Sequence, residues 1–173
     1  MKRNQSILPA AGRGLGGHLR TWIAATLLLL LAAAPASARD IPGAGVSIDD
    51  IVAWLHGAGY SAQIVPDSNG ESHVKTSSGG TNFGVYLFDC KEGRCGSIQF
   101  AAGFATHGHF DVSRMNEWNH DNRWARGYFD STNDPWVEMD VDLTPGGTYE
   151  LLDDELSTWN NTLARFVKLY GLQ

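Results

Sequence analysis

The stretch Met115-Asn116-Glu117-Trp118-Asn119-His120-Asp121-Asn122-Arg123 decides the fold. Its three asparagines recur at i, i+3 and i+6, and a helix over residues 112–123 places Val112, Met115, Asn119 and Asn122 on one face. A buried carboxamide without a partner costs about 1–3 kcal/mol, so we expect Asn119 and Asn122 to bond exposed backbone at a sheet edge or the last carbonyls of their own helix. We interpret the run as a fold signature. The alternative is that its amides bind a ligand.

The first 38 residues are typical of a secretory signal peptide. Four basic residues and no acid precede an apolar run, Trp22 to Ala34, and Ala36-Ser37-Ala38 after it matches a small-x-small cleavage pattern. The apolar run has 13 residues, whereas a helix needs about 20 to cross a bilayer. We therefore expect cleavage after Ala38 and a periplasmic or secreted protein without stable membrane insertion. The alternative is an uncleaved anchor.

Cleavage there leaves 173 − 38 = 135 residues, which suits one domain. We expect a linker over residues 39–46 and a single domain over residues 47–173. The four basic residues leave with the signal, so 13 − 4 = 9 Lys and Arg remain against 19 Asp and Glu, a formal charge of −10. Such an acidic domain argues against nucleic acid as a partner and suits a basic protein partner.

Hydrophobic periodicity predicts alternating strands and helices in this domain. We expect helices over residues 48–58, 112–123 and 149–170, with Ser47, then Asp111 or Ser113, then Thr148 as their N-caps. We expect strands over residues 60–65, 71–77, 82–89, 96–104, 124–130 and 136–143, with Val137, Met139, Val141 and Leu143 of the last strand facing inward. Strands joined by short turns form an antiparallel sheet, and helices must cover one of its faces. The sequence thus predicts an α+β fold with an antiparallel sheet of five to six strands and three helices, in the order α-β-β-β-β-α-β-β-α.

Apolar residues in the last predicted helix recur at 4-3-4-3-4 spacing, from Leu152 to Tyr170. We expect this stripe to cover the sheet, because most helical stability comes from an amphipathic face buried against other elements. The alternative is a seam between two copies in a homodimer.

Cys90 and Cys95 flank a four-residue turn between two predicted strands. In an exported protein, an intrachain disulfide across this hairpin is favoured over a zinc half-site or a redox pair. Four intervening residues do not match the two-residue spacing of thioredoxin-like motifs, and two cysteines alone cannot fill a closed zinc site.

Three segments together resemble the YbjN-domain family of bacterial proteins: the hairpin over residues 86–100, the N-x-W-N-x-x-N-R run over residues 116–123, and Glu138-Met139-Asp140-Val141-Asp142. The resemblance covers nearly all of residues 47–168. Its motif residues are Asn116, Trp118, Asn119, Asn122, Arg123 and Asp140. It implies a fold similar to type III secretion chaperones and a role in sensing or regulation. It supplies no agreed catalytic residues, and many members are cytoplasmic, so the export signal departs from the family pattern.

Histidines offer a candidate metal site. His107 and His109 form an H-x-H pair near Asp111 and His120 in the sequence. Neutral imidazoles with a carboxylate can bind a transition metal. The alternative is solvated surface, because a second shell of supporting residues is not visible in the sequence.

Acidic and aromatic residues on the predicted strands offer a candidate partner surface. Glu138, Asp140 and Asp142 share one strand face. Their simplest role is a hydrated surface that resists edge-to-edge aggregation. The alternatives are a calcium site, a paired-acid site or a surface for a basic partner. If one face of the sheet is open, Tyr86, Phe88 and Trp136 form an exposed apolar patch of the kind that marks interaction sites. The alternative is that helices cover all three aromatic residues.

The sequence contains no nucleophile elbow, phosphate-binding glycine loop or helical zinc-protease motif. We interpret the protein as an exported, non-enzymatic protein-binding or chaperone-like module, regulatory in role, with no cofactor and with an unidentified protein partner or a second copy of itself. It would hold a partner polypeptide on its sheet or on a groove beside the helix over residues 112–123. The alternative is a metal-binding protein or metal-dependent enzyme that uses His107, His109 and His120.

Overall fold

The structure is a computed structural model that describes residues 39–67, 70–106 and 111–172. The predicted signal peptide over residues 1–38 and the pair His107 and His109 lie outside the described residues. No described helix is both long and apolar enough to cross a membrane.

The described residues form a six-stranded antiparallel sheet in the order β2-β3-β4-β5-β7-β6. Its strands are β2 (Gln63–Pro66), β3 (Ser72–Ser78), β4 (Thr81–Lys91), β5 (Arg94–Gly103), β6 (Arg126–Phe129) and β7 (Pro135–Asp142). The helices are α2 (Ile48–Gly57), α3 (Val112–Asp121) and α4 (Tyr149–Tyr170). The predicted α+β class and the order of helices and strands are confirmed.

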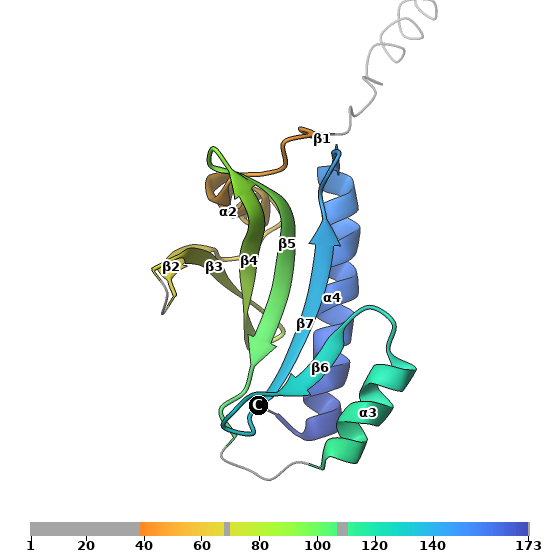
Figure 1. The fold of residues 1–173 in the computed structure, drawn as a ribbon. Helices are drawn as coiled ribbons and strands as arrows, with labels where there is room; N and C mark the ends of the chain where they lie inside the picture. The colour runs from red at the N-terminus through yellow and green to blue at the C-terminus, as the bar shows by residue number, and fades with distance from the viewer. Residues whose placement is uncertain (1–38, 68–69, 107–110, 173) are drawn as a thin grey trace, which may run out of the picture. The chain divides into compact units, whose positions relative to one another are not determined.

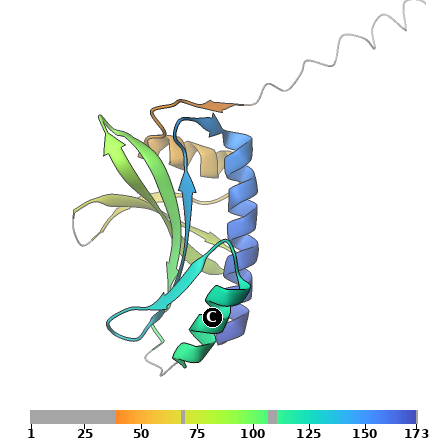
Figure 2. The ribbon, with the colours of Figure 1, turned by 45° about the vertical axis from the view of Figure 1, so that its right-hand side comes forward.

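All three helices lie on one face of the sheet, and α4 runs along most of its length (Figure 1, Figure 2). The stripe at 4-3-4-3-4 spacing is buried in the core: Leu152, Leu156, Trp159, Leu163, Phe166 and Tyr170. Rings from the sheet meet it, with Phe100 stacked on Trp159 at 5.7 Å between centroids. The stripe is therefore occupied by contacts within the chain, as predicted.

The helix ends follow the local sequence. The Ser47 side chain accepts a hydrogen bond from the Asp50 N–H, and the Asp50 carboxylate accepts one from the Ser47 N–H, which makes a capping box. At the start of α3 the Asp111 side chain accepts from the Ser113 N–H, and at the start of α4 the Thr148 side chain accepts from the Leu151 N–H. The predicted caps are confirmed at all three helices.

The segment expected as a linker, residues 39–46, is instead folded onto the domain. Its strand β1 (Asp40–Ile41) pairs with β8 (Gly147–Thr148), and Ile41 and Val46 are buried in the core. The guanidinium of Arg94 donates two hydrogen bonds to the Gly45 carbonyl. Ile41 and Val46, together with these backbone contacts, hold the segment on the domain despite its proline and two glycines.

The hairpin between β4 and β5 is closed by the Cys90–Cys95 disulfide, with the two cysteines opposite each other in register. The predicted pairing is confirmed. A loop of this length restricts the unfolded chain by about 2 kcal/mol.

Candidate functional site

The face of the sheet opposite the helices is left uncovered by the described part of the chain (Figure 2). Side chains alternate along each strand, so the residues that face away from the core align in rows across the strands. One row joins Tyr86 on β4, Gln99 on β5 and Asp140 on β7. The Gln99 carboxamide donates to the Asp140 carboxylate at 2.8 Å. We call this surface the open face.

The adjacent row holds a charged network around Glu138. Its carboxylate accepts hydrogen bonds from the Arg126 guanidinium at 2.7 and 3.1 Å and from the Tyr128 hydroxyl at 2.7 Å. Both donors come from β6, which pairs with β7 in the register that sets Arg126 opposite Glu138. Glu138 is only 8 % exposed. The expectation that it lies on a hydrated face is therefore wrong, because the long β6 side chains fold over it.

Two glycines let aromatic rings lie flat on the open face. The Tyr86 ring covers Gly84, and the Trp136 indole covers Gly103, so that a side chain at either glycine would collide with the ring above it. Tyr128 stacks on Trp136 at 6.3 Å between centroids. We call the aromatic residues of the open face, which come from strands β4, β6 and β7, the aromatic shelf: Tyr86, Phe88, Tyr128 and Trp136.

The three aromatic residues predicted as a patch lie on this face, outside the helix layer. Phe88 is 45 % exposed, and Tyr86 and Trp136 are half-buried. The helices therefore do not cover them, but neighbouring side chains do in part. His73 stacks on Tyr86 at 4.5 Å, and the Trp136 indole N–H donates to Asp130 at 3.2 Å.

Burial on the open face shifts the pKa values of Tyr86, Tyr128 and His73. Burial raises the pKa of the Tyr86 hydroxyl, and nearby Asp67 and Glu138 raise it further. Burial also raises the pKa of Tyr128, assisted by its hydrogen bond to Glu138. Burial lowers the pKa of His73. Both tyrosines and His73 are accordingly neutral at pH 7, and the charges of the face come from its carboxylates and from Lys75 and Arg126.

The asparagine motif closes one edge of the sheet. The Asn119 side chain donates to the Gly127 carbonyl at 3.0 Å and accepts from the Gly127 N–H at 2.8 Å, as a neighbouring strand would. The Asn122 side chain donates to the Trp118 carbonyl at 2.8 Å, at the end of α3. Both predicted kinds of backbone bond are thus present.

The buried stripe of α3 differs from the one expected. Met115 and Trp118 are buried, whereas Val112 is 60 % exposed and Asn119 lies at the surface. The helix ends at Asp121, since Asn122 already has extended backbone angles. The Trp118 ring meets the core edge-on against Phe166, at 5.0 Å between centroids.

Two of the remaining motif residues, Arg123 and Asp140, lie near the β6 edge. Asn116 is exposed, and the Arg123 guanidinium lies 4.6 Å above the centre of the Trp124 ring. A shallow notch of about 300 Å³ brings Asn119, Asn122, Arg123 and Asp140 together with Arg126 and Glu138. The motif and Asp140, which are far apart in the sequence, are therefore neighbours.

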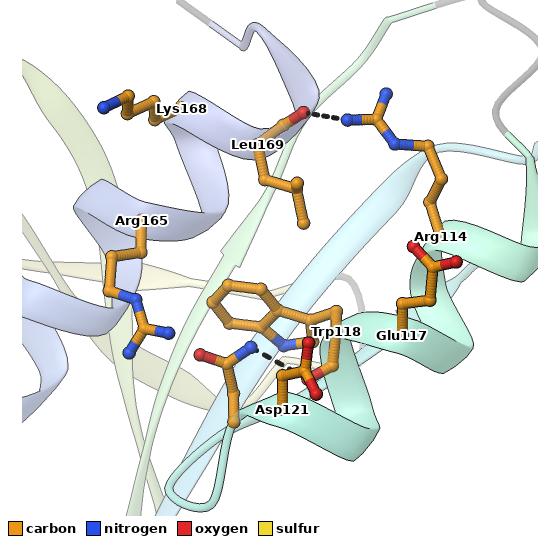
Figure 3. A pocket seen from close by; sticks show the side chains of 8 residues that line it. Arg114, Glu117, Trp118, Asp121, Arg165, Lys168 and Leu169 are labelled. Carbon is orange, nitrogen blue, oxygen red and sulfur yellow. Dashed lines mark hydrogen bonds between the residues drawn. The ribbon is translucent and has the colours of Figure 1, made fainter.

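On the other side of the same motif, a groove of about 500 Å³ separates α3 from α4 (Figure 3). Helix α3 contributes Arg114, Glu117, Trp118 and Asp121 to it, and α4 contributes Arg165, Lys168 and Leu169. Arg114 bridges the two helices by donating to the Leu169 carbonyl at 2.7 Å. Sequence reasoning anticipated a groove beside the helix over residues 112–123 but did not identify the residues that line it, because the polar residues of α4 are indistinguishable from an ordinary solvated helix face.

The histidine site gains no support from the described residues. His120 is exposed and pairs with Asp121 at 2.7 Å. Within residues 39–67, 70–106 and 111–172, no group of three or more His, Cys, Asp or Glu side chains lies close enough to hold a metal ion. His107 and His109 lie outside that range.

Sequence reasoning also missed Arg126 and Tyr128. Their i, i+2 spacing on a predicted strand places them on one face, but only the pairing of β6 with β7 directs that face onto Glu138. The alternation was a signal available in the sequence, and the register was not.

Comparison with known proteins finds a family and a fold. The family model YbjN, described as "Putative bacterial sensory transduction regulator", matches residues 47–169. Among solved structures, the chain is similar to "Crystal structure of YbjN, a putative transcription regulator from E. coli", with 12 % identity and a TM-score of 0.55, over 73 % of this chain and 95 % of that one. At this identity the likeness shows the fold alone. The curated proteins contain no match.

Proposed function

This chain belongs to the YbjN family, and from that membership and the open face of its sheet we propose that it is an exported, regulator-like binding module that holds a basic segment of a partner protein on that face. The chemistry of the described residues suits binding. The open face has aromatic rings, carboxylates and carboxamides.

The observation that carries the proposal is the uncovered aromatic shelf. The described helices cover one face of the sheet, and the other presents Tyr86, Trp136, Tyr128 and the exposed Phe88. Aromatic residues are enriched in interface cores, where they bury large areas at low cost in conformational entropy. A flat shelf of rings on a rigid sheet is preorganised for such a contact.

Charge indicates the kind of partner. Asp89, Asp140 and Asp142 are exposed around the shelf, and residues 39–173 carry 9 Lys and Arg against 19 Asp and Glu, a formal charge of −10. Carboxylates next to aromatic rings favour Lys and Arg side chains, through ion pairs and through the ring faces. A basic segment of a partner protein therefore fits this surface best.

Face binding is favoured over strand addition. The β6 edge is occupied at Gly127 by the Asn119 side chain. The opposite edge is β2, which has four residues and ends on Pro66. Short edge strands and proline both discourage the pairing of another strand.

Export is part of the proposal and rests on the first 38 residues of the sequence. The Cys90–Cys95 disulfide agrees with it, because disulfides persist in oxidising compartments. Mass spectrometry of the protein recovered from an expressing bacterium tests it directly. A mature N-terminus at Arg39 is expected, and a cytosolic protein that retains Met1 would contradict export.

A pull-down tests the binding function. The protein is expressed from its full sequence, recovered, and used to capture partners from an envelope extract, alongside Phe88→Ser and a matched control, Leu151→Ser. Both residues are exposed and apolar, at 45 % and 47 %, but Leu151 lies on α4. We expect one stoichiometric partner for the wild type and the control and a weaker one for Phe88→Ser. Equal recovery by all three would argue against the open face.

A further inference from the structure

The groove between α3 and α4 has walls of opposite charge. Figure 3 shows Arg165 and Lys168 on α4 across from Glu117 and Asp121 on α3, with the Trp118 indole between the two helices. No ion pair joins the two walls among the described residues. Arg114 is already engaged with the Leu169 carbonyl and the Tyr170 ring. Asp121 is bonded to the neighbouring His120 through Oδ1 alone, so its second oxygen, Glu117 and Arg165 have no ion-pair partner among the described residues.

Two polar atoms in the groove lining have no partner. The Trp118 indole nitrogen, in a side chain that is only 3 % exposed, is a donor without an acceptor, and the Asn122 carboxamide oxygen is an acceptor without a donor. Leaving such groups unpaired is unfavourable, and nearly all buried polar groups in proteins are satisfied. Beside the groove, the Trp118 indole N–H therefore needs an acceptor and the Asn122 oxygen needs a donor. Both atoms lie between a cationic wall and an anionic wall.

We infer that this groove binds the zwitterionic head group of a small apolar α-amino acid. The carboxylate of such a ligand would accept from the Trp118 indole N–H and pair with Arg165. Its ammonium would donate to the Asn122 oxygen and pair with Asp121. The apolar side chain would lie against Leu169 and the indole ring.

The geometry favours a zwitterion over a simple ion. A dicarboxylate would meet Glu117 and Asp121, and a diamine would meet Arg165 and Lys168, so each would face one repelling wall. A volume of about 500 Å³ is of the size that small-molecule ligands occupy. Both unpaired atoms are covered in the ligand-free molecule, so binding requires the side chains that cover them to move aside.

Nuclear magnetic resonance of the ¹⁵N-labelled protein, expressed from its full sequence, tests the inference. L-Leucine, L-phenylalanine and L-methionine are titrated to about 10 mM, a range that detects even millimolar affinity. We expect at least one of them to shift the assigned Trp118 indole and Asn122 carboxamide resonances in a saturable way. N-acetyl-L-phenylalanine lacks the ammonium and L-phenylalaninamide lacks the carboxylate, and each is expected to bind at least about tenfold more weakly than L-phenylalanine.

Two surface substitutions locate the site. Arg165→Gln and Asp121→Asn remove one charge from each wall at exposed positions and are expected to weaken binding at least about tenfold. Lys91→Gln, an exposed charge change at the end of β4, serves as the control and leaves binding unchanged. The inference is overturned if none of the three amino acids shifts the two resonances, or if the wall variants bind as well as the control.

Discussion

Replacing Asn119 by aspartate tests whether one carboxamide closes the β6 edge of the sheet. In the native protein, the side chain accepts from the Gly127 N–H at 2.8 Å and donates to the Gly127 carbonyl at 3.0 Å. A carboxylate keeps the first bond. It loses the second and sets an oxygen against the carbonyl oxygen instead.

The expected cost follows from these contacts. A typical hydrogen bond contributes about 0.5–1.5 kcal/mol net, and an unsatisfied buried group adds about 1–3 kcal/mol. Gly127 is buried whereas Asn119 is at the surface, so water can relieve part of the penalty. We expect Asn119→Asp to lower the free energy of unfolding by about 2 kcal/mol at pH 7, or Tm by roughly 6–8 °C for a domain of this size.

The penalty depends on pH in a direction that the geometry fixes. Only the protonated form of the introduced carboxyl can donate to the Gly127 carbonyl, so folding raises its pKa above the unfolded value of about 3.9. The penalty is therefore full above the folded pKa and disappears as the pH falls below the unfolded pKa. Urea unfolding of variant and wild type at pH 7 and near pH 4 measures this difference.

Asn116→Asp is the matched control, because Asn116 lies three residues earlier on the exposed side of α3. It makes the same chemical change without the contact to Gly127. Equal destabilisation by the two substitutions, or a cost at Asn119 that does not change between pH 7 and pH 4, would refute the reasoning.

Three further predictions concern stability. The pKa of the Asp50 carboxyl is lowered in the folded protein, chiefly by the hydrogen bond from the Ser47 backbone N–H. Asp50→Ala should therefore lower the free energy of unfolding by about 1 kcal/mol at pH 7. Unfolding curves should show this difference shrinking as the pH falls below about 3.9, the unfolded pKa, and through the lower folded pKa. Reduction of the Cys90–Cys95 disulfide should lower the free energy of unfolding by about 2 kcal/mol in denaturant titrations, and no change would show that the hairpin is equally restricted without it. Arg126→Leu should lower the free energy of unfolding by about 3 kcal/mol, because it leaves the buried Glu138 carboxylate without its ion-pair partner. Glu138→Leu should cost only about 1 kcal/mol, because the Arg126 side chain is 66 % exposed and can reach water. A larger loss for Glu138→Leu than for Arg126→Leu in calorimetry would contradict this.

Elements with strong local patterns were predictable. The alternation along β7 placed Val137, Met139 and Val141 in the core, where they are buried. The spacing along α4 and the capping residues of all three helices likewise needed only neighbouring residues. The motif asparagines were predictable as backbone partners because an amide has few other ways to be satisfied near a helix end.

Features that depend on long-range pairing were not predictable. Glu138 looked solvated in the alternating pattern of β7, and its burial comes from the register with β6. Residues 39–46 looked like a linker because the partner strand, β8, lies more than a hundred residues away. The groove arises where α3 and α4 approach each other, and neither helix sequence encodes that approach alone.

Photo-crosslinking from the open face tests the central claim most directly. A photoreactive phenylalanine analogue is placed at Phe88 on the shelf and, in a separate variant, at Leu151 on the helix layer, and each full-sequence protein is irradiated in the producing cell. We expect a single adduct of defined mass from position 88 and none from position 151. Adducts from both positions alike, or from neither while the protein is folded, would contradict a partner bound on the open face.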